Sequence, residues 1–179
     1  MTNTLIKLGL VICCFLLAGW MAPDDSPSTA QVVTLDECDP ATFNAPGAVG
    51  ADFCKNVALG ASTTFSELFR KAAQGTPDPN WDFEPDALTV RKGTTITVVN
   101  QGGEPHTFTE VTKFGGGFIG PLNGGEEVAS ECDGGFSRVS VARTRILQGS
   151  QLQVTGLSTG EHYFQCCIHP WMRTKIEVK

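Results

Sequence analysis

The chain has 179 residues, which is enough for one domain with an extension. It carries 13 Lys and Arg against 19 Asp and Glu, a formal charge of -6 at pH 7, and it has no basic run, which excludes a typical nucleic-acid-binding protein. It has three histidines, too few for sites that need many imidazoles, such as multi-copper oxidase centres.

Residues 1–30 are predicted to be a signal peptide and linker. Lys7 precedes the apolar run Leu8–Ala18, which is typical of a secretory signal, and the small residues Ser28 to Ala30 offer a cleavage site. The alternative is an uncleaved anchor, although the segment is marginal in length and contains a lysine. We therefore expect an exported protein that is periplasmic, secreted or anchored at the cell exterior, with no other membrane contact.

Residues 31–79 are predicted to be a helical extension that packs on the core of the following domain. Thr64 and Glu67 match a capping box, and Gly75 suits the end of the helix that it begins. The apolar residues of one helix face follow the expected spacing, and they are Phe65, Leu68, Phe69, Ala72 and Ala73. A second helix is expected over Asp52–Leu59.

Residues 80–179 are predicted to form a β domain. Short runs of β-forming residues alternate with Gly and Asn turns, which favours a β-sandwich or barrel. The expected strands are Ala87–Arg91, Thr94–Asn100, His106–Thr112, Arg138–Leu147, Gln151–Leu157, Glu161–Cys166 and Thr174–Lys179. The Gly-rich stretch Phe114–Asp133 is expected to be a long loop.

Five cysteines follow the signal segment, and they are Cys38, Cys54, Cys132, Cys166 and Cys167. In an exported protein cysteines pair as disulfides, so an odd number leaves one thiol that needs a function. Metal coordination is such a function. The other four cysteines allow three connectivities, between which the sequence does not choose.

The C-terminal tail contains a thiol, an imidazole and a thioether within seven residues, at Cys166, His169 and Met172. Soft sulfur ligands favour copper, and imidazole suits both of its oxidation states. A site of two histidines, one cysteine and a weak axial methionine needs a second histidine. His106, which follows Pro105, is the candidate.

With these residues the sequence resembles the cupredoxin family, which comprises the plastocyanin-like and amicyanin-like blue copper proteins. The Cys-x-x-His-x-x-Met spacing, the upstream histidine and a closing strand directly after the motif carry the resemblance over residues 80–179. It implies an all-β fold, a Greek-key β-sandwich or barrel. It also implies one copper ion per chain, bound by His106, Cys166, His169 and Met172. The sequence departs from plastocyanin after the first histidine, where Thr107 stands in place of the usual asparagine.

The two adjacent cysteines are predicted to have different roles. Cys166 has the two-residue gap to His169, and strand alternation places it on the same face as the apolar Phe164. Cys167 then faces away and is predicted to pair with Cys132, which leaves Cys38 and Cys54 for a local bridge. The rival pairing, a bond between Cys166 and Cys167, would destroy the metal site.

Three further residues lie near the tail motif. His162 shares the face of Cys166 but is four residues away, so it is interpreted as a structural residue. Pro170 and Trp171 have two interpretations: they pack in the core, or they form an apolar rim around an exposed edge of His169, where a partner protein docks.

The predicted function is one-electron transfer by a monomeric type 1 copper protein with an unidentified redox partner, rather than enzymatic catalysis. The alternative is a copper-binding protein for storage, delivery or sensing outside the cytoplasm. Nitrite reduction would need a second copper ion with its own histidines. A binuclear centre would need wider spacing than two adjacent cysteines provide.

Overall fold

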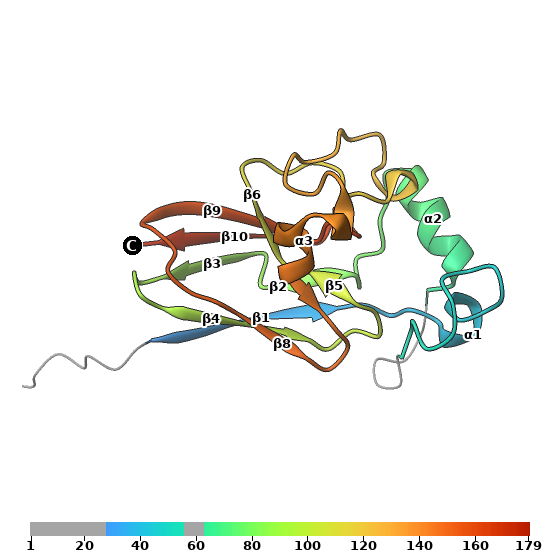
Figure 1. Cartoon of the computed structure of the whole chain (residues 1–179), viewed down its shortest axis with the longest axis horizontal. Coiled ribbons are helices and arrows are strands. Elements are labelled where there is room, and N and C mark those ends of the chain that lie inside the picture. The colour runs from blue at the N-terminus through green and yellow to red at the C-terminus, as the bar shows by residue number, and fades with distance from the viewer. Residues whose placement is uncertain (1–27, 56–62) are drawn as a thin grey trace, which may run out of the picture.

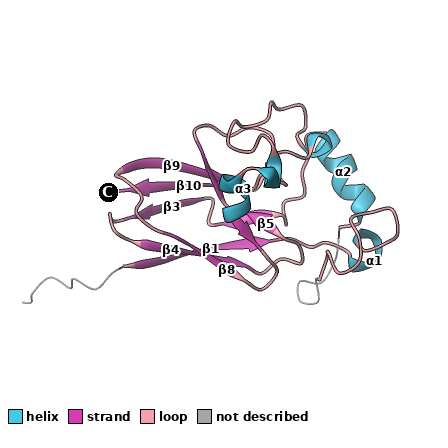
Figure 2. Ribbon diagram, viewed as in Figure 1, coloured by secondary structure: helices cyan, strands magenta, loops and turns pink. Residues whose placement is uncertain are grey.

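A computed structural model describes residues 28–55 and 63–179, so most of the predicted signal peptide lies outside the described residues. Two four-stranded sheets pack face to face, and two of the helices lie at one end (Figures 1 and 2). The predicted all-β sandwich is therefore confirmed. No helix in the described part of the chain has the length and hydropathy of a membrane span.

The first sheet has the strand order β2-β1-β4-β8. Its strands are β1 (Thr29–Leu35), β2 (Asp82–Glu84), β4 (Thr95–Asn100) and β8 (Gln151–Val154). Strand β1 runs parallel to β4, with Val32 opposite Val98, and antiparallel to β2. Every second residue of β4 is buried, because one face of this strand covers the core.

The second sheet has the order β3-β10-β9-β6. Its strands are β3 (Ala87–Val90), β6 (Thr109–Val111), β9 (Gly160–Gln165) and β10 (Arg173–Val178). A short pair, β5 (His106–Thr107) with β7 (Arg145–Ile146), lies beside the two sheets. Aromatic rings join the layers: Phe108 stacks on Phe164 with a centroid distance of 4.5 Å and lies tilted against Phe83 at 5.1 Å.

The N-terminal segment belongs to the sandwich and is more than a helical extension. The prediction for residues 31–79 is wrong for residues 31–35, since they lie in β1, hydrogen-bonded between β2 and β4. A parallel pairing between segments more than 60 residues apart leaves no local signal in the sequence. The predicted cleavage after Ala30 would fall inside β1, whose first two residues pair with Thr95 and Ile96.

The helix predicted to begin at the capping box of Thr64 and Glu67 is confirmed as α2 (Phe65–Ala73). A short helix that the sequence did not indicate, α1 (Pro40–Phe43), is capped by the side chain of Asp39. Of the second helix expected over Asp52–Leu59, residues 52–55 are not helical and the rest lies outside the described residues.

Two predicted strands are wrong in part. The strand expected over Arg138–Leu147 is instead α3 (Val139–Arg143) followed by β7. Its β-branched residues favoured a strand. Within α3, however, Val141 is buried against the Cys132–Cys167 bridge while Val139 is 62% exposed. The strand expected over His106–Thr112 is divided at Phe108 into β5 and β6, because the chain passes from one sheet to the other.

The remaining strands begin and end within a few residues of the predicted bounds. The Gly-rich loop is confirmed, and its regular structure is a single 3₁₀ turn, η1 (Gly120–Leu122), with a second turn, η2 (Gly135–Ser137), just beyond it.

Two disulfides pair four of the five mature cysteines. Cys38 is bonded to Cys54 and Cys132 to Cys167, as predicted, and Cys166 is the free, buried cysteine of the described residues. The second bridge joins the end of the Gly-rich loop to the second residue of the tail motif, in a small apolar cluster with Val111, Ala129 and Val141. The rival bond between Cys166 and Cys167 is not formed.

Removing the second bridge should destabilise the fold. The bonded residues are 35 apart in sequence, so the chain-entropy model assigns the bridge about 4 kcal/mol of the free energy of unfolding. We expect the double variant Cys132→Ala, Cys167→Ala, which leaves no new thiol, to lose about this amount in urea unfolding. The matched variant Cys38→Ala, Cys54→Ala should lose about 3 kcal/mol, since its loop is shorter. A loss below about 1 kcal/mol would mean that packing alone holds the Gly-rich loop.

Candidate metal centre

The candidate ligands come from two places in the fold. His106 is the first residue of β5, whereas Cys166 and His169 lie where β9 turns into β10. This turn is closed by two backbone hydrogen bonds: the N–H of Cys166 donates to the carbonyl of Met172, and the N–H of Met172 donates to that of His169, both at 3.0 Å. The short loop therefore fixes the thiol and the second imidazole relative to each other.

Three ligand atoms converge at the end of the sandwich. The Sγ of Cys166 lies 3.9 Å from Nδ1 of His106 and 4.0 Å from Nδ1 of His169, and the three atoms lie within 4.8 Å of one another. A metal ion bound at about 2.0 to 2.3 Å from each would hold such atoms about 3.5 to 4 Å apart. One thiolate and two imidazoles are the donors that copper and zinc accept. The residues therefore fit a bound metal ion.

The surroundings of Cys166 favour the ionised form of its thiol. Burial alone would raise its pKa, but hydrogen bonds and charge from His106 and His169 outweigh burial and hold the pKa well below its usual range. Backbone N–H groups of Thr107 and His169 also point at the sulfur, each at 3.5 Å. Since the thiolate is the form that binds metals, these contacts favour the reactive state.

Asp36 contacts the ring of His106 on the side opposite to Cys166 and so orients it. Its Oδ2 lies 2.7 Å from Nε2 of His106, and both side chains are fully buried. Burial lowers the pKa of His106, but Asp36 and Cys166 outweigh it and raise the pKa to about 10. Asp36 also accepts the backbone N–H groups of Glu104 and Cys38. The proton on Nε2 is thereby held by Asp36, and Nδ1 faces the thiol. A metal ion at Nδ1 would displace the proton that the charged ring carries there, and this would give a carboxylate–histidine–metal arrangement.

Glu104 has the corresponding position beside the second imidazole. Its Oε2 lies 3.4 Å from Nε2 of His169, and both side chains are 2% exposed. Burial, with the nearby charge of Asp36, raises the pKa of Glu104 well above its usual range, and burial lowers the pKa of His169. His169 is therefore held as a neutral ring with Nδ1 toward Cys166.

Thr107 takes over the positioning role at the place where plastocyanin usually has asparagine. Its Oγ1 accepts the backbone N–H of Cys167 at 2.7 Å, and the hydroxyl of Thr109 donates to it at 3.2 Å. A hydroxyl thus ties β5 to the cysteine loop in place of an amide.

Met172 is fully buried in the same core cluster as Cys166. Its role as an axial ligand stays a prediction. His162, by contrast, lies away from the centre, where it contacts Glu110 at 2.6 Å and the carbonyl of Ser158 at 2.8 Å. The interpretation of His162 as a structural residue agrees with these contacts.

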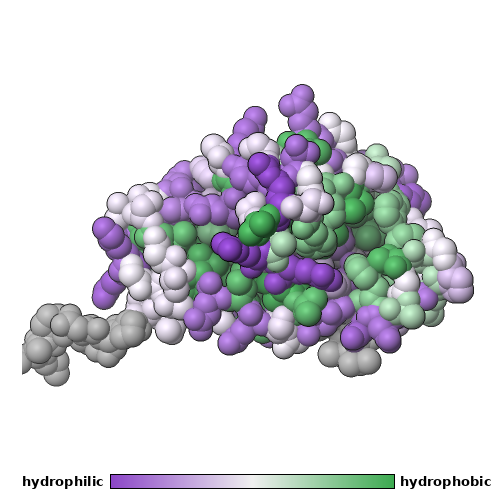
Figure 3. All heavy atoms as spheres, in the orientation of Figure 1, coloured by the Kyte–Doolittle hydropathy of each residue, from purple (hydrophilic) through white to green (hydrophobic). Residues whose placement is uncertain are grey.

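The expectation of an exposed edge on His169 is wrong. The side chain of His169 is 2% exposed, and Pro170 is buried as well. Trp81 and Trp171 pack on the imidazole, with centroid distances of 4.7 Å and 5.6 Å. The two helices α1 and α2 lie at this end of the sandwich (Figure 1), where apolar side chains also gather at the surface (Figure 3). These two helices form an N-terminal cap on the site. How far the cap covers the site depends on long-range packing, which no local sequence pattern indicates.

Three important residues were missed by sequence reasoning. Asp36 and Trp81 reach the centre through long-range packing and carry no local signal. Glu104 could have been found, because it lies two residues before His106 and a carboxylate beside a metal-binding histidine is a common partner.

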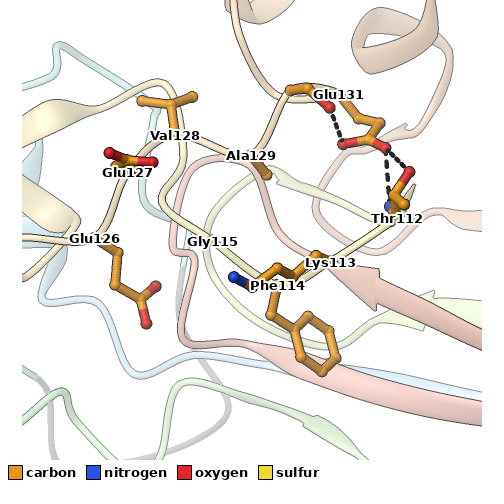
Figure 4. Close-up of a pocket in the computed structure, with 10 residues that line it drawn as sticks. Thr112, Lys113, Phe114, Gly115, Glu126, Glu127, Val128, Ala129 and Glu131 are labelled. Atoms are coloured by element: carbon orange, nitrogen blue, oxygen red, sulfur yellow. Dashed lines mark hydrogen bonds between the residues drawn. The ribbon is translucent and has the colours of Figure 1, made fainter.

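A separate surface pocket of about 430 Å³ lies over the Gly-rich loop (Figure 4). Glu126, Glu127 and Glu131 line it, and Glu131 points to Thr112, whose backbone N–H donates to it at 2.8 Å. No histidine or cysteine lines this pocket, so it is distinct from the metal centre.

No family model and no curated protein sequence match this chain. The solved structures similar to it are cupredoxins. A purple cupredoxin from Nitrosopumilus maritimus is 14% identical, with 84% of this chain and 99% of that protein covered and a TM-score of 0.40. Oxidised plastocyanin from Dryopteris crassirhizoma is 15% identical, with 84% and 100% covered and a TM-score of 0.40. A mutant amicyanin with Cu(I) is 19% identical, with 55% and 73% covered and a TM-score of 0.36. These likenesses are distant.

Replacing Asp36 should weaken metal binding. In Asp36→Asn the charge that orients His106 is lost while the side chain keeps its size, and we expect the affinity for Zn²⁺ to fall about 10- to 100-fold. Competition with a chromophoric chelator measures this change. The matched variant Glu177→Gln removes an exposed carboxylate on β10 that contacts Thr89 and Lys179, and it should bind Zn²⁺ as the unmodified chain does. Equal affinities for the two variants would contradict the role given to Asp36.

Proposed function

We propose that the chain binds one copper ion through His106, Cys166 and His169, with Met172 as a weak axial ligand, and acts as a one-electron carrier. The observation that carries the proposal is the buried thiol of Cys166, unpaired while its neighbour Cys167 is in a disulfide, with two imidazole Nδ1 atoms within 4.0 Å. This donor set is the one preferred by electron-transfer copper sites. When bound, copper would supply the reversible exchange between Cu(II) and Cu(I).

The protein's own residues provide a rigid, dry frame for this exchange. Asp36 holds His106, Glu104 faces His169, and Thr107 fixes the cysteine loop. All three ligands are 2% exposed or less, so solvent does not reach them. Because each ligand is held by a second contact, little movement is expected between the two oxidation states, and a small reorganisation favours fast electron transfer.

We propose that a redox partner docks at Trp171. It would not contact His169 directly, because this residue is buried. Trp171 is half-buried, packs on His169 and lines a surface groove of about 220 Å³ together with Pro170 and Arg173. The indole ring therefore connects the buried imidazole with the surface. A redox protein that docks on this groove would reach the centre through one aromatic ring.

A location outside the cytoplasm is part of the proposal. The two disulfides support it, since such bonds persist in oxidising compartments. The apolar N-terminal run supports export as well.

The colour of the copper form tests the ligand set. With stoichiometric Cu(II), the chain from Ser28 onward should show intense visible absorption and a narrow copper hyperfine splitting, because a thiolate is bound. Cys166→Ala should be colourless, whereas the double variant Cys132→Ala, Cys167→Ala should stay coloured. A coloured Cys166→Ala would overturn the assignment of the thiolate.

A second measurement separates electron transfer from copper delivery. Since the ligands are buried and held by second contacts, we expect copper to be retained over many cycles of oxidation and reduction in voltammetry. Transfer to a stronger Cu(I) chelator should be slow compared with electron exchange. Rapid loss of Cu(I) to the chelator would favour the alternative of copper storage or delivery.

A further inference from the structure

One surface beside the metal centre carries positive charge in an otherwise acidic chain. The stretch 134–160 contains no Asp or Glu, and its charged residues are three arginines. They lie in the part of this stretch that forms η2, α3 and β7, and exposed apolar side chains lie among them. We call this surface the arginine face, and its residues are Phe136, Arg138, Val139, Arg143, Arg145 and Leu147.

The residues of the arginine face are joined by contacts between their elements. The guanidinium group of Arg145 lies over the ring of Phe136, 5.0 Å from its centroid, and so connects β7 with η2. Val139 and Arg143 are four residues apart on α3 and share one side of this helix. Leu147 follows β7 and is 49% exposed. Helix α3 lies on the side of the molecule that Figure 1 turns to the viewer, where hydrophilic and apolar side chains are mixed (Figure 3).

The arginines of this face have no acidic partner in the part of the chain that the structure describes. Arg143 and Arg145 form no ion pair there, and Arg138 donates to the backbone carbonyl of Ser130. A guanidinium group matches a carboxylate with two parallel hydrogen bonds. The arginine face can therefore receive carboxylates from another molecule.

Strand β7 connects the arginine face with the first imidazole of the metal centre. In its pairing with β5, Arg145 lies opposite Thr107 and Ile146 lies opposite His106. The side chain of Ile146 is 1% exposed and belongs to the core. No residue of the arginine face lines the groove at Trp171, so the two surfaces are distinct.

We propose that the arginine face docks an acidic protein, whose carboxylates pair with the arginines and whose apolar side chains pack on Phe136 and Val139. Arginine and aromatic residues are enriched in protein interfaces. The formal charge of -6 disfavours contact of an acidic partner with the rest of the surface. At close range the arginines dominate, because charges beyond a Debye length of about 8 to 10 Å are screened. An acidic partner is thereby directed to this face.

Two other occupants fit these observations less well. Basic clusters that bind anionic lipids contain about four to eight Lys or Arg, whereas this face has three in a chain of negative net charge. A second copy of the chain would have to bind with a different, acidic surface. Such a head-to-tail contact uses two different patches and leaves one of each open, unless the copies close into a ring.

Docking at the arginine face does not require copper, because none of the candidate ligands belongs to it. Electron exchange with a partner bound there would rest on the proposed function, with His106 as the nearest ligand in the β5–β7 pair.

Acidic peptides test the docking surface. A short peptide of alternating Glu and Tyr is added to the isotope-labelled protein, both metal-free and with Cu(I), and the changes in amide chemical shifts are mapped by NMR. We expect the largest changes over residues 136–147 in both forms. The affinity should fall at least about threefold between about 0.05 and 0.3 M salt, because the attraction is screened. No measurable binding, largest changes elsewhere, or equal binding of a peptide of alternating Lys and Tyr would overturn the proposal.

A pair of variants with the same change in net charge locates the contact. Arg143 belongs to the arginine face, whereas Arg91 is exposed between β3 and β4. We expect Arg143→Glu to weaken binding of the Glu–Tyr peptide at least about fivefold and Arg91→Glu to change it less than about twofold. Equal weakening by both variants would mean that net charge alone attracts the peptide, and it would overturn the proposal.

A second pair tests the apolar part of the contact. Val139→Ser should weaken binding of the Glu–Tyr peptide at least about threefold, whereas Val49→Ser changes an exposed valine outside the face and should leave binding unchanged. Tighter or equal binding of a peptide of alternating Glu and Ser would contradict the apolar contact.

Vesicles and sedimentation separate the other two occupants. We expect no binding to vesicles of phosphatidylglycerol and phosphatidylcholine, and a single monomeric species in sedimentation velocity. Vesicle binding that Arg143→Glu abolishes would assign the face to a membrane, and self-association that Arg143→Glu abolishes would assign it to a second copy. Either result would overturn the proposal.

The outcomes also separate this proposal from the proposed function. Peptide docking without copper uptake would contradict the proposed function and leave the arginine face as a docking surface. Copper uptake without peptide docking would do the reverse.

Discussion

The structure depends on keeping one thiol reduced and buried between two imidazoles. Cys166 is adjacent in sequence to a cysteine that is oxidised, so the fold must separate the two sulfur atoms. Directly after β9 the two side chains take opposite directions: Cys166 belongs to the main core cluster, whereas Cys167 belongs to the small cluster that contains Cys132. The disulfide to Cys132 then removes the nearest competing thiol. The same bridge fixes the loop and preserves the ligand.

The centre also joins parts of the chain that are distant in sequence. Asp36 follows β1, and its position is set by the parallel pairing of β1 with β4. Because Asp36 also receives the backbone N–H of Glu104, one carboxylate orders both His106 and the segment that carries the second carboxyl group. The N-terminal segment therefore completes the metal centre, and a domain that began at residue 80 would lack the partner of His106.

The sequence was sufficient to predict those parts of the fold and of the site whose geometry is set by residues close together in the chain. The ligand loop, the choice between Cys166 and Cys167 and the capped helix α2 were predictable because each is set within a few residues. Long-range pairing was not predictable, and for that reason β1, Asp36 and Trp81 were missed. The five-residue helix α3 was taken for a strand because its valines have high β-propensity, which tertiary contacts of Val141 override. The burial of His169 depends on how the cap docks, which no local pattern encodes.

Burial of the second imidazole has opposite effects on the proposed electron transfer. A dry site with ligands held by Asp36, Glu104 and Thr107 keeps reorganisation small, but it also increases the distance between the centre and a docked partner. Trp171 reduces this conflict, since its ring contacts His169 on one side and the surface groove on the other. The cap therefore limits contact with the centre to the groove at Trp171 but does not block that contact. In the proposed function a partner would have to fit the groove at Trp171, and selectivity among partners would follow from the same packing that keeps water away from the three candidate ligands.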